Sequence, residues 1–373
     1  MRARKLWRRT PRASLATALL AIACGTNVSP DAEHTPSATV AGAAKPPAAE
    51  PEATAKGFNP RLLRRFAPLR ARLDATGQVP SEALIALGRS LYFDKRLSKN
   101  RDLSCNSCHR LSAYGVDGEP TSPGDKGQRG ARNSPTVYNA AGYFVQFWDG
   151  RAANVEEQAK GPILNPIEMA MPNAAAVVTR LRAIPGYGPE FAQAFPSEAS
   201  PLTYDNVGRA IGAFERGLTT PARWDRYLAG DKTVLSAAEI EGLRLFTNVG
   251  CMVCHTGELL GGNSYQRAGA VEPWPNQQDL GRAAVTKNDA DRMMFKVPTL
   301  RNITKTAPYF HDGSARTLDV AVRMMGKHQL GLDLADSEVS SIVTWLDTLT
   351  GTPAAAYVAE PTLPPDGPEG STP

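Results

Sequence analysis

Apolar residues recur at helical spacing through much of the chain. The clearest example is a stripe near the C-terminal end, made of Val339, Ile342, Val343, Leu346 and Leu349. This spacing places the five side chains on one face of a helix, where a neighbouring element can bury them. Asp336 or Ser337 can cap the start of this helix, and Gly351 its end. No stretch of useful length alternates apolar and polar residues as a half-buried strand would. The pattern predicts an all-α fold with few or no strands.

Two further helices are predicted at corresponding places in the two halves of the chain. One opens at Ser81 and leads to Gly88. The other opens at Ser236, with Glu239 three residues later as in a capping box, and leads to Gly242. Each helix carries Gly-x-x-Leu and an aromatic residue shortly before a Cys-x-x-Cys-His motif. This internal repeat predicts two similar domains in tandem, at residues 58–230 and 231–353.

The ends of the chain lack helical periodicity. Residues 1–24 combine a basic start with an apolar run too short for a permanent membrane span, which is typical of an export signal. The run ends in Leu20-Ala21-Ile22-Ala23-Cys24, which resembles a bacterial lipobox and would make Cys24 a lipid-modified first residue. Ordinary cleavage near Ala23 is the alternative. Residues 25–57 and 354–373 are predicted to be a disordered tether and a disordered tail.

The net charge does not indicate a nucleic-acid-binding protein. The chain has 42 Lys and Arg against 37 Asp and Glu. Six of the basic residues lie in residues 1–23, which hold no acidic ones, so the rest of the chain is close to neutral. Of the five cysteines only Cys24 lies outside the two Cys-x-x-Cys-His motifs, which rules out a disulfide framework.

The two motifs are the strongest chemical signal in the chain. They are Cys105-Asn106-Ser107-Cys108-His109 and Cys251-Met252-Val253-Cys254-His255. Cys-x-x-Cys-His is the attachment motif of c-type haem, in which both cysteines form thioethers and the histidine binds the iron. A four-thiolate zinc site is the main alternative, but a histidine follows each pair and the pairs lie far apart. A redox dithiol would not need the histidine. We therefore expect two covalently bound haem c groups.

Each iron takes a second axial ligand or keeps one side open for a small molecule. Methionine is a common second ligand, and it raises the reduction potential. Met169 and Met171 follow the first motif, and Met324 and Met325 follow the second. Spacing alone does not separate Met324 from Met325.

Several longer stretches occur in an order typical of one enzyme family. They are Phe147-Trp148-Asp149-Gly150-Arg151-Ala152, residues 158–169, residues 297–302, residues 306–313 and Gln329-Leu330-Gly331. Over about residues 80–352, the chain resembles the bacterial di-haem cytochrome c peroxidases. The resemblance implies a low-potential peroxidatic haem on Cys105, Cys108 and His109. It also implies a high-potential haem for electron entry on Cys251, Cys254 and His255.

The resemblance also assigns roles to single residues. Glu168 matches the family's distal acid–base glutamate, and Gln158 another residue of that pocket. Trp148 matches the tryptophan between the haems, and Met325 the distal ligand of the second iron. The match further implies a calcium ion between the domains, held by Asn133, Thr306 and Pro308.

The chain departs from the family pattern in one loop. Many members have a histidine there that caps the peroxidatic iron in the resting oxidised enzyme. Here the position holds Asp125, and no histidine occurs between His109 and His255. We expect an open or water-bound first iron and an enzyme that needs no reductive activation. Asp125 as a replacement iron ligand is the less favoured alternative, because a carboxylate in a Gly- and Pro-rich loop is usually solvated.

The resemblance favours a peroxidase of the periplasm that reduces hydrogen peroxide to water. The electron donor would be a small cytochrome c or copper protein, the enzyme a homodimer, and Cys24 its only link to a membrane. Two alternatives are a MauG-like oxidase of a protein substrate and a non-catalytic di-haem electron carrier. A tyrosine replaces the axial methionine in the MauG branch, which Met325 argues against. A carrier would need both irons six-coordinate and would have no use for Glu168 with Gln158.

Overall fold

A computed structural model of the chain describes residues 59–74 and 79–367. The expected export signal with Cys24 and the expected tether lie outside these residues. Within the described residues, no helix is both long and apolar enough to cross a membrane.

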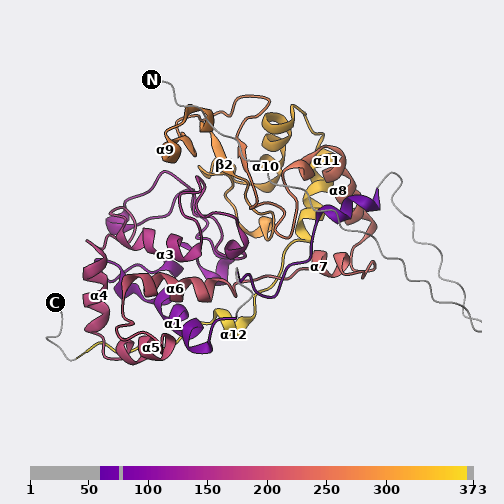
Figure 1. Cartoon of the computed structure of the whole chain (residues 1–373). Coiled ribbons are helices and arrows are strands. Elements are labelled where there is room, and N and C mark those ends of the chain that lie inside the picture. The colour runs from indigo at the N-terminus through magenta and orange to yellow at the C-terminus, as the bar shows by residue number, and fades with distance from the viewer. Residues whose placement is uncertain (1–58, 75–78, 368–373) are drawn as a thin grey trace, which may run out of the picture. The chain divides into compact units, whose positions relative to one another are not determined.

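The described part of the chain is mostly helical, which confirms the predicted fold class (Figure 1). The helices of the N-terminal half are α1 (Glu82–Phe93), α2 (Cys105–Cys108), α3 (Val155–Leu164), α4 (Ala174–Arg182), α5 (Tyr187–Ala194) and α6 (Tyr204–Glu215). They are followed by α7 (Arg223–Leu228), α8 (Ala237–Asn248), α9 (Ala283–Thr286), α10 (Leu318–Met325), α11 (Asp336–Asp347) and α12 (Ala355–Val358). The only sheet among the described residues has two short antiparallel strands, β1 (Tyr265–Arg267) and β2 (Met294–Lys296).

The core of the N-terminal half forms where α1 crosses α6. The Ser81 side chain caps α1 by accepting a hydrogen bond from the Leu84 N–H at 3.2 Å. Gly88 lies at the crossing, where a Cβ atom would come within 1.8 Å of the Ala210 carbonyl oxygen. Four residues further along each helix, Tyr92 meets Phe214 with ring centroids 5.4 Å apart. Glycine at residue 88 therefore allows the two backbones to approach closely.

The C-terminal half repeats this arrangement with α8 and α11. A Cβ atom on Gly242 would come within 2.0 Å of the Ser341 carbonyl oxygen. Four residues further on, Phe246 meets Trp345 with ring centroids 4.4 Å apart. The structural repeat thus extends the one predicted from the sequence, because α6 and α11 are also equivalent.

The predicted helix starts are confirmed at α8 and corrected at α11. Ser236 and Glu239 form the expected capping box. Helix α11, however, includes Asp336, and its cap is Ala335, whose N–H donates to the Glu338 side chain at 2.9 Å. It also ends before Gly351, where the Thr220 carbonyl would be 2.2 Å from an added Cβ. Gly351 is therefore explained by a close backbone approach.

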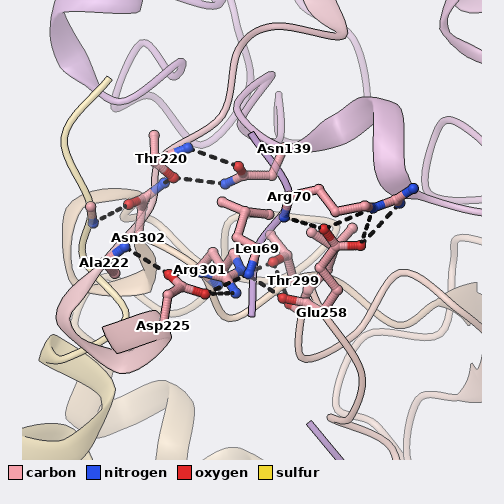
Figure 2. A network of polar contacts seen from close by, with 12 residues as sticks. Leu69, Arg70, Asn139, Thr220, Ala222, Asp225, Glu258, Thr299, Arg301 and Asn302 are labelled. Atoms are coloured by element: carbon pink, nitrogen blue, oxygen red, sulfur yellow. Dashed lines mark hydrogen bonds and ion pairs between the residues drawn. The ribbon is translucent and has the colours of Figure 1, made fainter. Parts of the chain in front are cut away.

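A buried polar network links segments far apart in the sequence (Figure 2). The fully buried Arg301 binds both carboxylate oxygens of Asp225, at 2.8 and 2.9 Å. The Thr220 hydroxyl accepts hydrogen bonds from the side-chain amides of Asn139 and Asn302, at 2.8 and 2.9 Å. The network therefore joins residues of the two predicted domains through the segment that contains α7.

The prediction of a disordered C-terminal tail is wrong for residues 354–367. Helix α12 places Tyr357 against Phe214 of α6, with stacked rings 5.2 Å apart. The Tyr357 hydroxyl donates to the Phe214 carbonyl at 2.7 Å, and Arg96 donates to the Pro364 carbonyl at 2.9 Å. A Pro-rich segment can build no core of its own, but this one packs on the core of the N-terminal half.

Candidate functional site

The first Cys-x-x-Cys-His motif occupies a single helical turn. Helix α2 spans Cys105–Cys108, and His109 follows directly. The His109 Nδ1 atom lies 3.3 Å from the Gly115 carbonyl oxygen. A carbonyl can only accept, so Nδ1 carries the proton and Nε2 keeps its lone pair. Burial lowers the pKa of His109, which keeps the ring neutral at pH 7 and able to bind a metal through Nε2.

The second motif presents its histidine in the same way. The His255 Nδ1 atom donates to the Leu260 carbonyl at 3.0 Å, and burial lowers the pKa of this ring too. The iron-binding histidine therefore has the same tautomer in both halves of the chain.

A cavity of about 460 Å³ adjoins the second motif. Its lining includes Cys251, Cys254 and His255 on one element and Met325 on another. Most of the remaining lining is apolar, including Ile342 and Leu346 of α11, and the volume is in the usual range for a cofactor site. The donor set and the apolar walls fit a haem c attached through both cysteines.

Met325 is better placed than Met324 as the second ligand of this haem. Met325 lines the cavity with His255, whereas Met324 lines a separate pocket with Arg323 and Lys327. Met325 is the last residue of α10, where the chain turns into a π-helical segment, Gly326–Leu330. The geometry thus supports the assignment that the family resemblance implied.

The four motif cysteines are not gathered into one thiolate cluster. Burial raises the pKa of Cys108 to about 11 and that of Cys251 to about 12, which favours an uncharged form of both sulfur atoms. Nowhere in residues 59–74 and 79–367 do three or more His, Cys, Asp or Glu side chains gather as metal ligands. A thioether carries no charge and suits these buried positions.

Glu168 lies close to the first motif. Burial raises the pKa of its carboxyl, while Arg151 and the Asn165 amide lower it. Asn165 Nδ2 donates to Glu168 Oε1 at 2.7 Å. The charge of Glu168 raises the pKa of both Cys105 and Cys108, which places it within electrostatic reach of the haem-attachment site. Gln158 is half-buried on α3, the helix that leads into this loop.

Asp125 is buried, which corrects the expectation that it is solvated. Its side chain accepts a hydrogen bond from Asn100 Nδ2 at 2.6 Å. Its backbone N–H lies 3.0 Å from the Ile167 carbonyl and 2.8 Å from the Glu168 carbonyl. The loop around Asp125 therefore packs directly on the loop that carries Glu168. Sequence reasoning missed Asn100, because no motif links it to this loop.

Trp148 contacts segments of both halves. Its indole Nε1–H donates to the Asn133 carbonyl at 3.0 Å, and its own carbonyl accepts from the Lys296 N–H at 2.8 Å. Trp148 also lines the cavity of the second haem. Asn133, Thr306 and Pro308, the residues expected to bind calcium, line the same cavity.

Comparisons with known proteins agree with this site. The model of the di-haem cytochrome c peroxidase family matches residues 82–233. A cytochrome c551 peroxidase of Nitrosomonas europaea is 48% identical over 267 residues, which cover 71% of this chain and 79% of that protein. A cytochrome c551 peroxidase of Pseudomonas aeruginosa is 43% identical over 310 residues, covering 81% and 89%.

Solved structures give the same result. A MauG-like protein associated with microbial copper homeostasis superimposes with a TM-score of 0.68 at 29% identity, covering 84% of this chain and 99% of that one. The two haem-attachment motifs, each with a neutral histidine, fit two haem c cofactors. Together with the matching relatives, they show that this chain is a haem peroxidase of the di-haem cytochrome c peroxidase family, with two haem c cofactors.

Proposed function

We propose that this enzyme reduces hydrogen peroxide to water at the first haem, with electrons that enter one at a time at the second. The observation that carries the proposal is the partly buried Glu168 carboxyl beside the first motif, with its raised pKa. A carrier of electrons alone has no need of a buried carboxyl there.

Glu168 acts as the proton carrier of the reaction. When bound, the first haem supplies the iron at which peroxide is reduced. The Glu168 carboxylate takes a proton from one peroxide oxygen and returns it to the other, so that water can leave. Asn165 holds one carboxylate oxygen and so orients the group. Gln158 can donate a hydrogen bond to an oxygen without changing charge.

Trp148 and Met325 serve the electron path. Methionine as second ligand raises the potential of the second haem, which favours uptake of an electron from a donor. Trp148 lines the cavity of that haem and hydrogen-bonds to Asn133 in the N-terminal half. These contacts support a role of Trp148 in passing electrons between the two halves. Met325 also argues against the MauG-like alternative.

The first iron would keep one side open in the resting oxidised enzyme, because no histidine between His109 and His255 is there to cap it. The hydrogen bond from Asn100 holds the Asp125 carboxylate within the loop. Absorption and EPR spectra of the fully oxidised protein should show a high-spin first haem that reacts at once with hydrogen peroxide. Two low-spin haems and no reaction would contradict both the open iron and the absence of reductive activation.

Glu168→Gln tests the proton transfer. Loss of a positioned acid–base group lowers kcat by about 10²–10⁴-fold. The control is Glu157→Gln on α3, because Glu157 is 53% exposed and its one ion pair among the described residues is with Lys160 at the surface. A Glu168→Gln enzyme with the kcat of the unsubstituted protein would refute the role.

The expected export signal supports a setting outside the cytoplasm. The enzyme works in the periplasm, anchored through lipidated Cys24 on its tether, and takes electrons from a small cytochrome c or copper protein.

The enzyme is a homodimer, and a calcium ion binds at Asn133, Thr306 and Pro308. Chelation with EGTA should slow turnover and electron transfer between the haems; unchanged rates would remove the calcium site.

A further inference from the structure

The cavity of the second haem is lined by two buried side chains that carry nitrogen donors, Lys296 at 5% exposure and His311 at 4%. Trp148 lines the same cavity. The backbone N–H of Lys296 donates to the Trp148 carbonyl, and the His311 ring lies 6.4 Å from the Trp148 ring. Both residues therefore lie on segments that contact Trp148.

Lys296 is a buried cation without an ion pair. Its ammonium lies 3.9 Å from the centre of the Tyr143 ring, and among the described residues it pairs with no carboxylate. Asp149 is the acid that acts on it, but its carboxylate already pairs with Arg132 at 2.6 Å and Arg151 at 3.1 Å. Burial lowers the pKa of Lys296 to about 7. A buried ammonium is stabilised when an anion binds beside it.

His311 supplies a second donor to the wall of this cavity. Its ring stacks on Phe295 with centroids 4.1 Å apart, and its buried Nε2 has no hydrogen-bond partner among the described residues. A buried polar atom left unpaired costs about 1–3 kcal/mol. Such an atom on a cavity wall indicates that a bound group supplies the partner.

We propose that Lys296 and His311 form a carboxylate-binding subsite for the propionates of the second haem. The macrocycle fits the apolar part of the cavity, and its two carboxylates need donors where they meet the protein. The Lys296 ammonium would stabilise the reduced haem, because reduction removes one positive charge from the iron. The subsite would thus raise the potential of the haem that receives electrons. The inference rests on the haem cofactor and not on the proposed peroxide chemistry.

Three variants of the haem-loaded full chain test the subsite. Lys296→Gln removes the cation and Lys296→Arg keeps it, while Lys287→Gln removes an exposed cation of the same half. The measurements are the haem content, the reduction potential of the second haem, and the resonance Raman bands of propionate bending. None of these depends on turnover of peroxide, so a failure of the proposed function would be seen separately.

We expect Lys296→Gln to lower the equilibrium constant for reduction of the second haem at least tenfold, about 59 mV for one electron. It should also shift a propionate band, whereas Lys296→Arg and Lys287→Gln should do neither. The unsubstituted potential and bands in Lys296→Gln would overturn the proposal. If Lys296→Gln loses the second haem, its retention in Lys296→Arg supports the proposal, and its loss in both overturns it.

His311 is tested by the same measurements. His311→Leu removes the donor, and His311→Gln replaces it with an amide donor. A propionate band that shifts in His311→Leu and returns in His311→Gln supports the subsite. Equal bands in both variants and in the unsubstituted protein would limit the subsite to Lys296 and refute the role of His311.

Discussion

Gly242→Ala should destabilise the C-terminal half by forcing α8 away from α11. The added Cβ would lie 2.0 Å from the Ser341 carbonyl oxygen and 2.8 Å from Trp345 Cβ. Real Cβ atoms essentially never lie closer than 3.0 Å to such neighbours, so α8 must move by about 1 Å at the crossing. The substitution therefore acts on backbone atoms, which cannot rotate away as a side chain can.

The expected loss of stability is about 1–3 kcal/mol, the usual cost of overpacking a filled core. Replacing a glycine by alanine in a helix contributes about 0.5–1 kcal/mol in the opposite direction, so the net loss is about 0–2.5 kcal/mol, with a central value of about 1 kcal/mol. For a unit of 150–250 residues each kcal/mol corresponds to about 2–4 °C in Tm. The movement also displaces Phe246, Ile342 and Leu346, which line the cavity of the second haem.

The assay is thermal unfolding of the haem-loaded protein, followed separately in the absorption band of each haem. The control is Gly130→Ala in an exposed loop, where an added Cβ has no atom within 4 Å. The control should leave Tm unchanged or raise it slightly, because alanine reduces the backbone freedom of the unfolded chain. A Gly242→Ala protein as stable as the control would refute the close crossing of α8 and α11.

Three other perturbations test the packing of the two halves. Burial, and after it the charge of Glu156, raises the pKa of Glu215 to about 8. The folded protein therefore holds the Glu215 proton to a higher pH than the unfolded chain does. The neutral carboxyl makes its full contribution to the free energy of unfolding below about pH 4.5, and this contribution is lost as the pH rises to about 8. In Glu215→Gln, the free energy of unfolding should fall less steeply with pH over this range, by up to about 1.4 kcal/mol per pH unit. Urea unfolding at several pH values measures this dependence, and an unchanged dependence would contradict the assignment. Arg301→Met should lower the free energy of unfolding in urea by about 3–5 kcal/mol, because it leaves buried Asp225 without its cation. A loss under about 1 kcal/mol would show that the backbone N–H groups of Leu69 and Ala222, which donate to Asp225, are enough to stabilise its carboxylate. Truncation after residue 353 should cost about 2 kcal/mol, because it removes the Tyr357 stack and its hydrogen bonds, and unaltered unfolding would show that the segment is only peripheral.

Much of the cofactor site could be predicted because its signal is local. Each haem-attachment motif lies within five consecutive residues, and one turn of chain places its two cysteines and its histidine together. The capping box at Ser236 is equally local, and the structure confirms it. The choice between Met324 and Met325 was different, because both lie on one helix and only the shape of the cavity separates them.

The errors have a common physical cause. Asp125 was expected in solvent because its neighbours are Gly and Pro, but its burial depends on Asn100 and on the loop of Glu168. Residues 354–367 were expected to be disordered because they lack a core, but they use the core of the N-terminal half. In each case the residues that bury the segment are distant in the sequence, and no sequence pattern predicts the contact.

The sequence is enough to recognise the two haem-attachment motifs, the helical fold and the repeated helix before each motif, because each of these depends on residues within a few positions of one another. The tertiary structure is needed to see the burial of Asp125, the crossing of α8 with α11 at Gly242, and the presence of Lys296 and His311 on the wall of one cavity. Those features depend on contacts between distant segments. The free energy of such contacts comes from burial and from paired polar groups, which no single stretch of sequence contains.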